Sequence, residues 1–457
     1  MPHRPPAQMA LGSFAYAFGY HPAAWLQPGV PHDAATSLAH WVELARIAER
    51  GKMDFIFIAD SPAVAPGPNE SIARWTNSMN RPEPLTLLAA MAAQTTHIGL
   101  AATLSTSFYE PYNVARLFGM LDHVSHGRAS WNVVTSDHQA TSYNFGLDGL
   151  EPHALRYEKA REFFDIVCGL WDSYDDDAFI CDPGSGYYFH PDRLHPLDHK
   201  GKHYSVRGPL NLARPPQGRP VIAQAGGSEA GKEFAAETAE VVFSIGSSIE
   251  ESRAFYADLK GRMAKFGRAP DQLKVMPGIP VYVGRTEEEA DEKLARLGAS
   301  LNPAAGLSAL QLFMTGVDFS GLDLDQPVPA SRIDSNSNAS KAIFGVAEQL
   351  LRQEGMTLRQ MISRWAAQGS HTLFKGSPKQ VVDQMEEWFS TGAADGFMVM
   401  HPVMPHDLTD FVELVVPELQ RRGLYREDYS GTMLRDHLGL ARPASRYAAP
   451  PARDEVA

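Results

Sequence analysis

The sequence predicts a (β/α)8 barrel, and three observations carry that prediction. Eight short runs rich in β-branched and apolar residues recur along the chain. Polar residues or glycine follow each run, and then a segment with the apolar spacing of an amphipathic helix. The 457 residues are enough for one large barrel with insertions. This alternation indicates a parallel sheet buried on both faces, and the count of eight strands favours a closed barrel over the alternative, an open doubly wound sheet.

Each element is assigned from its apolar run or its helical periodicity. The predicted strands are, in chain order, Met9–Phe18, Asp54–Ala59, Ile98–Leu104, Ala129–Val134, Pro220–Gln224, Val241–Ile245, Lys274–Val283 and Gly396–Met400. The predicted helices are Ser37–Arg50, Pro84–Gln94, Pro111–Val124, His153–Trp171, Ala230–Ala239, Glu250–Lys265, Glu287–Leu297, Pro378–Ser390 and Leu408–Arg422.

Two stretches are longer than the connections of a simple barrel require. Residues 173–213 are rich in Asp, Gly, Pro and His and have little helical periodicity. Residues 298–368 combine a loop at 321–340 with helical patterns at 341–352 and 358–367. We expect both insertions to cover the carboxyl face of the barrel, where barrel enzymes place their sites.

Residues 1–443 are predicted to form a single barrel domain that carries both insertions. The C-terminal tail, residues 444–457, is rich in Pro, Ala, Arg and Asp. We expect this tail to be poorly ordered or to be held by a neighbouring subunit.

The composition is that of a globular protein with an acidic balance. Apolar residues make up 44% of the chain, charged residues make up 21%, and the formal net charge is −13. Nucleic-acid-binding proteins usually present a basic face, so no nucleic-acid partner is predicted. No apolar run has the length of a membrane span, and the N-terminus lacks an apolar signal region, so no membrane association is predicted. Cys168 and Cys181 alone cannot form a disulfide framework or a thiolate metal site, and we expect a cytoplasmic protein.

The segment Arg219–Ser228 predicts a phosphate-binding site. An apolar strand runs into Gly226, Gly227 and Ser228, and a helix pattern follows at once. Glycine lets the backbone turn sharply and approach a ligand closely. The unpaired N–H groups and the positive dipole end of the following helix favour a phosphate.

Polar residues follow several strands at the same end of the predicted barrel. Asp60 ends the second strand, Ser105 follows the third, and Asn132 lies in the fourth. Each one alone could cap the next helix, but together they describe hydrogen-bonding groups around a shared ligand. His153 and Tyr157 are four residues apart and share a helix face, where they could pack or could support a bound phosphate.

Two nucleotide-binding alternatives fit the sequence poorly. The segment from Gly226 to Lys232 has the G-x-x-x-x-G-K spacing of nucleotide triphosphatases, but Glu233 stands where Ser or Thr would bind magnesium. A carboxylate there would repel a triphosphate. No G-x-G-x-x-G follows a strand, which disfavours a resident nicotinamide dinucleotide.

Metal binding and glycoside hydrolysis are also disfavoured. His190, His195, His199 and His203 lie in one loop, but this loop lacks an H-E-x-x-H motif and two prolines break any helix, so no metal is predicted. A retaining glycosidase needs paired carboxylates at strand ends, and Asp60 and Asp137 have no obvious glutamate partner.

Long segments of the chain resemble one group of flavin-dependent enzymes. The matching segments are Glu49–Phe55, Gly127–Ser136, Val206–Leu210, Arg214–Gly226 and Val416–Gly423. They resemble the nitrilotriacetate and dibenzothiophene-sulfone monooxygenase group of the bacterial-luciferase-like superfamily. The resemblance extends from about Leu11 to Pro443.

This resemblance implies a (β/α)8 barrel that binds reduced FMN (FMNH2), with O2 as co-substrate and a separate NAD(P)H:flavin reductase as partner. A small organic substrate would be oxygenated through a flavin C4a-hydroperoxide, which the protein must protect from water. Family members are typically homodimers or homotetramers. The resemblance leaves two alternatives open, namely a deazaflavin (F420)-dependent oxidoreductase of the same superfamily and a flavin-binding protein without catalytic activity.

The resemblance also implies roles for individual residues. The cofactor-binding residues would be Asp60, Ser105, Asn132, His153, Tyr157, Gly227 and Ser228. The first three would line the isoalloxazine and ribityl region, and the last four would lie at the phosphate. His21, at the end of the first strand, would be the catalytic residue, donating a proton or orienting substrate because imidazole titrates near neutral pH. A buried structural role for His21 is the alternative.

Three departures from the family pattern concern the site. Gly227 stands where the family commonly has serine, which removes one phosphate-binding hydroxyl. Leu26 replaces an arginine, and His401 follows the last strand where paired prolines are common. We expect His401 to add a titratable group near the pocket. These changes leave the substrate open.

Overall fold

The structure is a computed structural model that describes residues 8–64, 69–74, 79–136, 138–314, 317–319, 321–332 and 355–448. The helix predicted at 341–352 and the candidate Asp137 lie outside the described residues. In the described part of the chain, no helix is long and apolar enough to cross a membrane.

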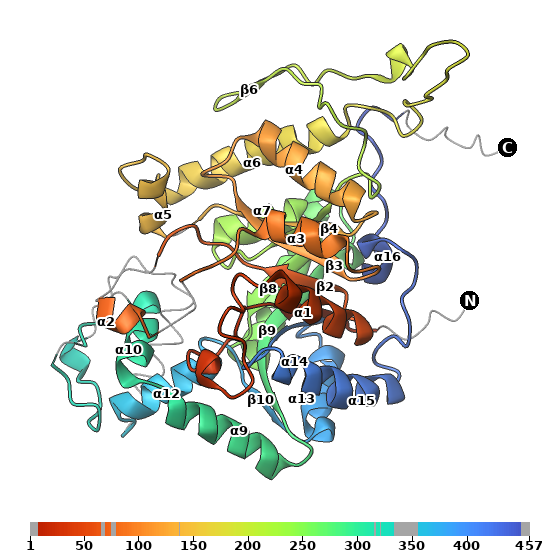
Figure 1. Ribbon diagram of the computed structural model, residues 1–457. Coiled ribbons are helices and arrows are strands. Elements are labelled where there is room, and N and C mark those ends of the chain that lie inside the picture. The colour runs from red at the N-terminus through yellow and green to blue at the C-terminus, as the bar shows by residue number, and fades with distance from the viewer. Residues whose placement is uncertain are drawn as a thin grey trace.

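Eight parallel strands close into a barrel (Figure 1). These strands are β1 (Ala10–Phe14), β2 (Phe55–Ile58), β3 (Gly99–Ser105), β4 (Ala129–Val134), β7 (Val221–Gln224), β8 (Val241–Ile245), β9 (Lys274–Val283) and β11 (Gly396–Met400). Strand β11 pairs with both β1 and β9, and β8 pairs with β9, so the ring has no open edge. One strand coincides with each of the eight predicted runs. The closed barrel is therefore confirmed, and the open doubly wound sheet is excluded.

Helices cover the outside of the barrel. They are α1 (Leu38–Arg50), α3 (Pro84–Ala92), α4 (Pro111–Val124), α6 (His153–Trp171), α7 (Glu229–Thr238), α8 (Ile249–Arg262), α9 (Glu287–Ser300), α13 (Pro378–Ser390), α14 (His406–Asp410) and α15 (Val416–Arg421), with short helices α2 (Asn69–Ile72) and α5 (Gln139–Asn144) in connections. Ser37, Ser248 and Thr286 begin their helices by accepting a hydrogen bond from the amide three residues later. The helix predicted at Leu408–Arg422 is interrupted by a π-helical turn at Phe411–Val415, just before Pro417, which lacks an amide donor.

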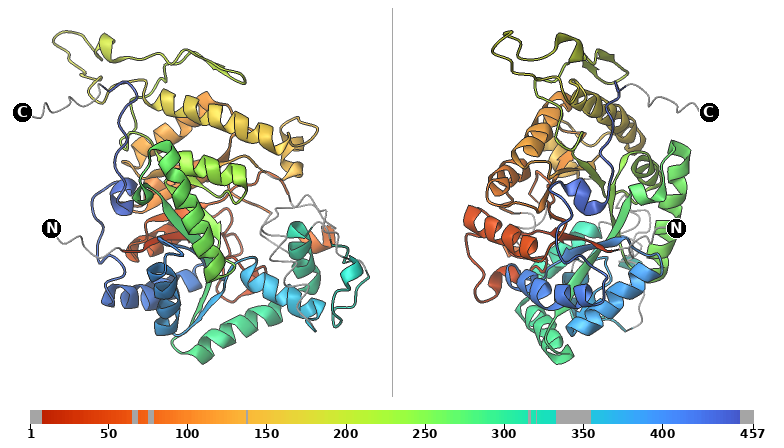
Figure 2. Two further views of the ribbon diagram at one scale, coloured as in Figure 1. Left: turned by 180° about the vertical axis from the view of Figure 1, so that it is seen from behind. Right: turned by 90° about the vertical axis from the view of Figure 1, so that its right-hand side faces the viewer.

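Helix α16 (Leu434–Leu438) closes the amino end of the barrel. Leu434 and Leu438 pack with side chains of the barrel interior, among them Phe55 and Val221. The right-hand view of Figure 2, from the side of the two termini, shows α16 in the middle of a ring of helices. Because α16 occupies this end, the carboxyl end is the one at which a ligand can enter.

The insertion at 173–213 lies along the outside of α6 and α4 (Figure 1) and does not cover the carboxyl face. Its hairpin of β5 (His199–Lys200) and β6 (Ser205–Val206) is held by Glu162 of α6, which accepts hydrogen bonds from the amides of His203 (3.0 Å) and Tyr204 (2.9 Å). The expectation that residues 173–213 cover the carboxyl face of the barrel is therefore wrong. The insertion follows a helix, not a strand, so it starts at the amino end of the barrel.

The insertion at 298–368 lies on the expected side of the molecule. Its helices α10 (Pro303–Phe313) and α12 (Leu358–Gln368) share a small core that includes Leu310, Met361 and Trp365. Figure 1 shows α10 beside α2, the short helix in the connection after β2, with α12 next to α10; all three lie on the side of the barrel away from α16. After α12, the short strand β10 (Phe374–Gly376) pairs with β9.

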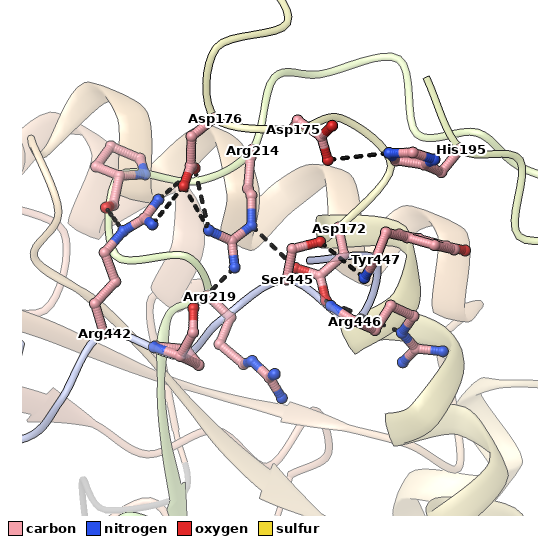
Figure 3. Close-up of polar contacts among 12 residues, drawn as sticks. Asp172, Asp175, Asp176, His195, Arg214, Arg219, Arg442, Ser445, Arg446 and Tyr447 are labelled. Atoms are coloured by element: carbon pink, nitrogen blue, oxygen red, sulfur yellow. Dashed lines mark hydrogen bonds and ion pairs between the residues drawn. The ribbon is translucent and has the colours of Figure 1, made fainter. Parts of the chain in front are cut away.

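Arg442, just before the C-terminal tail, contacts the first insertion, and the described part of the tail contacts the end of α6 (Figure 3). Arg442 donates to both carboxylate oxygens of Asp176, at 2.7 and 2.6 Å. The Arg446 amide donates to Asp172 (3.1 Å), whose other oxygen accepts from Arg214 (3.0 Å). Within residues 444–448, contacts inside the chain therefore hold the tail at the end of α6, and the expectation that a neighbouring subunit holds the tail stays a prediction.

Candidate functional site

The loop after β7 and the first turns of α6 and α7 meet at the carboxyl end of the barrel. Ser228 is the N-cap of α7, and its hydroxyl accepts a hydrogen bond from the Gly231 amide (3.1 Å). His153 Nε2, from α6, lies 3.3 Å from the same hydroxyl. The ring of Tyr157 packs on His153 with centroids 4.8 Å apart. Four predicted phosphate-site residues, Gly227 among them, therefore lie in one place.

The two glycines of this loop have different roles. A Cβ on Gly226 would lie 3.0 Å from Gly231 Cα, so the loop needs glycine to pass close to the first turn of α7. A Cβ on Gly227 would meet no atom within 4 Å, and Gly227 is exposed. Gly227 is thus the open side of the loop, where an anion can approach the free amides and the positive dipole end of α7.

Two lysines near this loop, one on α7 and one in the turn after α8, are bound to carboxylates. Lys232 contacts Asp258 (2.6 Å), and Glu233 accepts from Lys265 (3.1 Å). A triphosphate-binding loop needs its lysine free to reach phosphate oxygens. The contact between Lys232 and Asp258 therefore agrees with the rejection of the triphosphatase interpretation.

Polar side chains continue from this loop into the barrel. Asn132 is buried and donates from Nδ2 to Thr103 Oγ1 (2.9 Å) on the neighbouring strand. Ser105 Oγ accepts from Ser136 Oγ (2.8 Å) at the carboxyl ends of β3 and β4. Asp60, after β2, is half-buried, and burial raises the pKa of its carboxyl group. These side chains lie on consecutive strands, because β2, β3, β4 and β7 are neighbours.

Aromatic side chains form the opposite wall of the barrel mouth. Even-numbered residues from the end of β1 onward supply it, with Phe14 stacked on Tyr16 (centroids 4.8 Å apart) and Tyr16 beside Tyr20 (6.0 Å). Phe243 of β8 meets Phe14 edge-on at 5.8 Å. Burial raises the pKa of Tyr16 to about 12, so its phenol stays protonated at neutral pH. A cavity follows this wall, lined by residues that include Phe14, Tyr16, Phe18, Ala59 and Arg81.

His371 adds an imidazole to this wall. It comes from the loop between α12 and β10, and its ring centroid lies 5.6 Å from that of Phe243. His371 is buried, and burial lowers its pKa to about 4. The imidazole is therefore neutral at physiological pH.

His21 is buried in the loop that follows β1. Its Nδ1 accepts a hydrogen bond from the Ala23 amide (3.1 Å), so the neutral ring carries its proton on Nε2. Burial lowers the pKa of His21 to about 4. The expectation that His21 titrates near neutral pH is therefore wrong, because its side chain is only 1% exposed. At neutral pH His21 can donate a hydrogen bond but is not charged.

His401 packs away from the barrel interior. Met400 points into the barrel, and His401 lies against Phe411, with ring centroids 5.7 Å apart. Its side chain is fully buried, and burial lowers its pKa to about 3. The expectation that His401 adds a titratable group to the pocket is wrong, because the alternation of side chains along β11 turns it outward.

Comparisons with known proteins identify the family. A family model described as luciferase-like monooxygenase matches residues 14–395. The N-acetyl-S-(2-succino)cysteine monooxygenase of Bacillus subtilis is 44% identical, over 96% of this chain and 98% of its own. Nitrilotriacetate monooxygenase component A of Aminobacter aminovorans is 45% identical, over 97% of this chain and 99% of its own. The chain belongs to the luciferase-like monooxygenase family.

The fold of this luciferase-like monooxygenase is shared by a solved relative. The crystal structure of a long-chain alkane monooxygenase superposes with a TM-score of 0.82 at 34% identity, covering 94% of this chain and 95% of the other. The resemblance seen in the sequence is confirmed. The chain is accordingly an enzyme, an FMN-dependent monooxygenase.

Sequence reasoning missed part of the wall of this luciferase-like monooxygenase. The alternation of Phe14, Tyr16, Phe18 and Tyr20 is visible in the sequence and places them on one face. His371 has no such signal, because only the packing of the second insertion brings it to the barrel.

The loop histidines of this luciferase-like monooxygenase are paired with carboxylates. His195 contacts Asp175 (3.0 Å) and His199 contacts Glu162 (3.0 Å). Across the described ranges, no group of three or more His, Cys, Asp or Glu side chains is placed to hold a metal ion.

Proposed function

We propose that this protein is the oxygenase of a two-component system, using reduced FMN and O2 to oxygenate a small organic substrate. A separate NAD(P)H:flavin reductase would supply the reduced FMN. The observation that carries the proposal is the site formed by Ser228, Gly227, His153 and Tyr157 at two helix N-termini, which suits one phosphate group. The nitrilotriacetate relative is named component A, which indicates a second component and supports a separate reductase.

The residues present fit FMN and suggest a division of tasks. The Ser228 hydroxyl, the first-turn amides of α7 and the His153 imidazole would hold the phosphate. Asn132, Ser105 and Asp60 would bind the ribityl chain and ring. Bound reduced FMN would supply the activation of O2. The wall around Phe14, Tyr16 and Phe243 would exclude water from the reacting atoms.

A comparison of two flavins tests the phosphate site. Ser228→Ala removes a phosphate donor worth about 1–3 kcal/mol, so FMN affinity should fall by roughly fivefold to 150-fold. Riboflavin affinity should change little, because riboflavin lacks the phosphate. Fluorescence titration measures both dissociation constants. Equal losses for the two flavins would remove Ser228 from the phosphate site.

His21 is proposed as the catalytic residue of this site, acting as a neutral hydrogen-bond donor through Nε2. Its Nε2 is buried and has no hydrogen-bond partner among the described residues, so a substrate or cofactor atom could accept from it. His21→Ala should keep FMN affinity but lower the product formed per O2 consumed. His21→Gln retains an Nε2 donor and should restore much of that coupling. Unchanged coupling in the alanine variant would exclude His21 from the chemistry.

Two alternative functions are separated by one rapid-mixing experiment. Protein with reduced FMN is mixed with O2, and the absorbance is followed. A long-lived flavin spectrum distinct from the oxidised and reduced forms supports the monooxygenase, whereas immediate release of peroxide indicates a flavin-binding protein. Turnover with reduced F420 alone would favour the deazaflavin-dependent oxidoreductase. Solved F420-dependent neighbours are 16% and 13% identical and show the fold alone.

The proposal includes a homodimer, with a homotetramer as the other outcome of light scattering. An apolar stripe supports a self-associating face, because Leu117, Met120 and Val124 on α4 are 44%, 49% and 40% exposed at helical spacing. We also propose a cytoplasmic location and a single domain over residues 1–443. The exposed free thiol of Cys181 is consistent with a reducing compartment.

A further inference from the structure

The loop that follows β11 holds the backbone of His21. The His21 amide donates to the main-chain oxygen of Pro402 (3.1 Å), and the Tyr20 amide donates to that of His401 (2.8 Å). His21 lies in the loop after β1, and β1 and β11 are neighbouring strands of the barrel. The position of His21 therefore depends on the loop after β11.

The two loops also approach each other closely. Gly19 has a φ of +124°, and a Cβ there would overlap the main-chain oxygen of Pro402 and lie 2.7 Å from Val403 Cα. The Met404 amide donates to the main-chain oxygen of Phe18 (2.8 Å). Only glycine allows this approach, so a shift of one loop would displace the other.

Asp407 fixes the conformation of the loop after β11. Its Oδ2 accepts a hydrogen bond from the Val403 amide (2.9 Å), and its own amide donates to the main-chain oxygen of Val403 (2.8 Å). Both residues are buried. This pair of hydrogen bonds closes the turn directly after Pro402, whose carbonyl accepts from His21.

Lys293, on α9, holds the Asp407 carboxylate in place. Its Nζ lies 3.5 Å from Asp407 Oδ1, contacts Asp410, and donates to the main-chain oxygen of Val283 (2.7 Å) at the end of β9. A buried carboxylate needs a compensating charge or hydrogen bonds, and Asp407 has both. Contacts from Lys293 through Asp407 to Val403 thus connect the end of β9 with the loop after β11.

We propose that Asp407 is a positioning residue for His21. Asp407 fixes the loop after β11, and this loop fixes the backbone of the segment in which His21 Nδ1 accepts from the Ala23 amide. The ring therefore keeps one orientation, with Nε2 available as a donor. The inference rests on the proposed function, because that function makes His21 the catalytic residue.

Hydrogen exchange of the flavin-free protein, measured by mass spectrometry, tests this contact. Asp407→Ala removes the acceptor of the Val403 amide, so the amides of Tyr20 and His21 should exchange about tenfold faster. The amides of α16, at the opposite end of the barrel, should exchange as in wild type. Unchanged exchange at residues 20 and 21, or equal acceleration in α16, would overturn the positioning role.

Two matched variants separate the hydrogen bond from other effects of the substitution. Asp407→Asn keeps an oxygen acceptor for the Val403 amide and should retain most of the protection. Asp410→Ala is the control, because Asp410 contacts the same lysine, Lys293, whereas the Val403 amide is bound by Asp407. It should leave exchange at residues 20 and 21 unchanged.

Gly19→Ala tests the same contact from the other loop, and it serves if Asp407→Ala does not fold. The added Cβ would push against the main-chain oxygen of Pro402, so the amides of Tyr20 and His21 should again exchange faster. Wild-type exchange rates in this variant would contradict the dependence of His21 on the loop after β11.

Diethyl pyrocarbonate, a reagent that modifies accessible neutral imidazoles, reports on the ring itself. His21 is buried, so its modification in wild type should be slow. In Asp407→Ala it should be about tenfold faster, while His437, which is buried at the amino end, should react at an unchanged rate. Equal rates at His21 in both proteins would exclude Asp407 from positioning the imidazole.

Neither measurement needs flavin, so the failure of this inference differs from the failure of the proposed function. Wild-type protein that binds neither FMN nor riboflavin would overturn the proposed function and leave the exchange rates as they are. Where His21→Ala lowers the product formed per O2 consumed, Asp407→Ala should lower it too. Full coupling in Asp407→Ala would then overturn this inference alone.

Discussion

At the amino end of the barrel, buried charges are paired with each other, whereas at the carboxyl end the exposed donors are neutral. Arg435 is 1% exposed and contacts both carboxylate oxygens of Glu240, at 2.6 and 3.0 Å. At the other end, Ser228 and His153 face solvent, and Lys232 is turned to a carboxylate. The amino end satisfies its charges within the chain. The carboxyl end keeps hydroxyl, imidazole and amide donors available for a charge that a ligand brings.

This difference separates stability from binding. Removing one member of a buried ion pair leaves an uncompensated charge, which is costly to folding. Removing a neutral donor at an exposed helix N-terminus costs folding about 0.5–2 kcal/mol, less than breaking a buried ion pair, and it also removes a contact to an anion. Substitutions at the two ends should therefore change different measurements.

The largest effect is expected at the amino end, for Arg435→Met. Glu240 would remain half-buried without its partner, so the free energy of unfolding should fall by about 3–5 kcal/mol. Urea denaturation measures this loss, and the FMN affinity of the folded protein should not change. Lys52→Met is the control, because Asp428, its partner, is 81% exposed and such pairs contribute about 0–1 kcal/mol. Similar losses for both variants would contradict the distinction between the two ends.

The second-largest effect is on the pH dependence of stability and concerns His401, a neutral imidazole buried in the core near the carboxyl end. Its pKa of about 3 in the folded protein lies below the ordinary value of 6.5, so the unfolded chain takes up the proton first. The stability that this histidine contributes is complete above pH 6.5 and is lost as the pH falls toward 3. Between pH 6.5 and 4, wild type should lose about 3 kcal/mol more than His401→Leu.

Urea denaturation of both proteins at pH 7 and pH 4 measures that difference in stability. Equal losses would mean that His401 is not held neutral by burial. A lower FMN affinity of His401→Leu at pH 7 would mean that His401 contributes to the ligand pocket.

The barrel could be predicted from the sequence because its evidence is local. Each strand is a short apolar run, and Gly226, Gly227 and Ser228 mark the proposed phosphate site by residue type and position alone. The first insertion was misplaced because its length alone suggested a cover for the carboxyl face. The predicted helix His153–Trp171 precedes this insertion and brings the chain back to the amino end of the barrel.

The pKa values and the far wall of the site depend on tertiary packing. His21 looks like a titrating group in the sequence, and only its burial makes it neutral. His371 lies more than 100 residues along the chain from its neighbour Phe243. No sequence periodicity links residues that far apart, so only the three-dimensional structure shows that the imidazole of His371 belongs to the wall.

The smallest expected effect is a gain in FMN affinity at the carboxyl end, for Gly227→Ser. Gly227→Ser adds a Cβ that meets no atom within 4 Å, at a backbone conformation outside the left-handed region, so serine fits without strain. Its hydroxyl would add a neutral donor to the open side of the loop. FMN affinity should rise about fivefold, or roughly 1 kcal/mol, with riboflavin affinity unchanged in the same titration. Gly226→Ser is the control and should weaken FMN, because its Cβ would crowd Gly231. An equal change for both flavins would mean that the phosphate does not bind at Gly227, and it would contradict the proposed ligand of the carboxyl end.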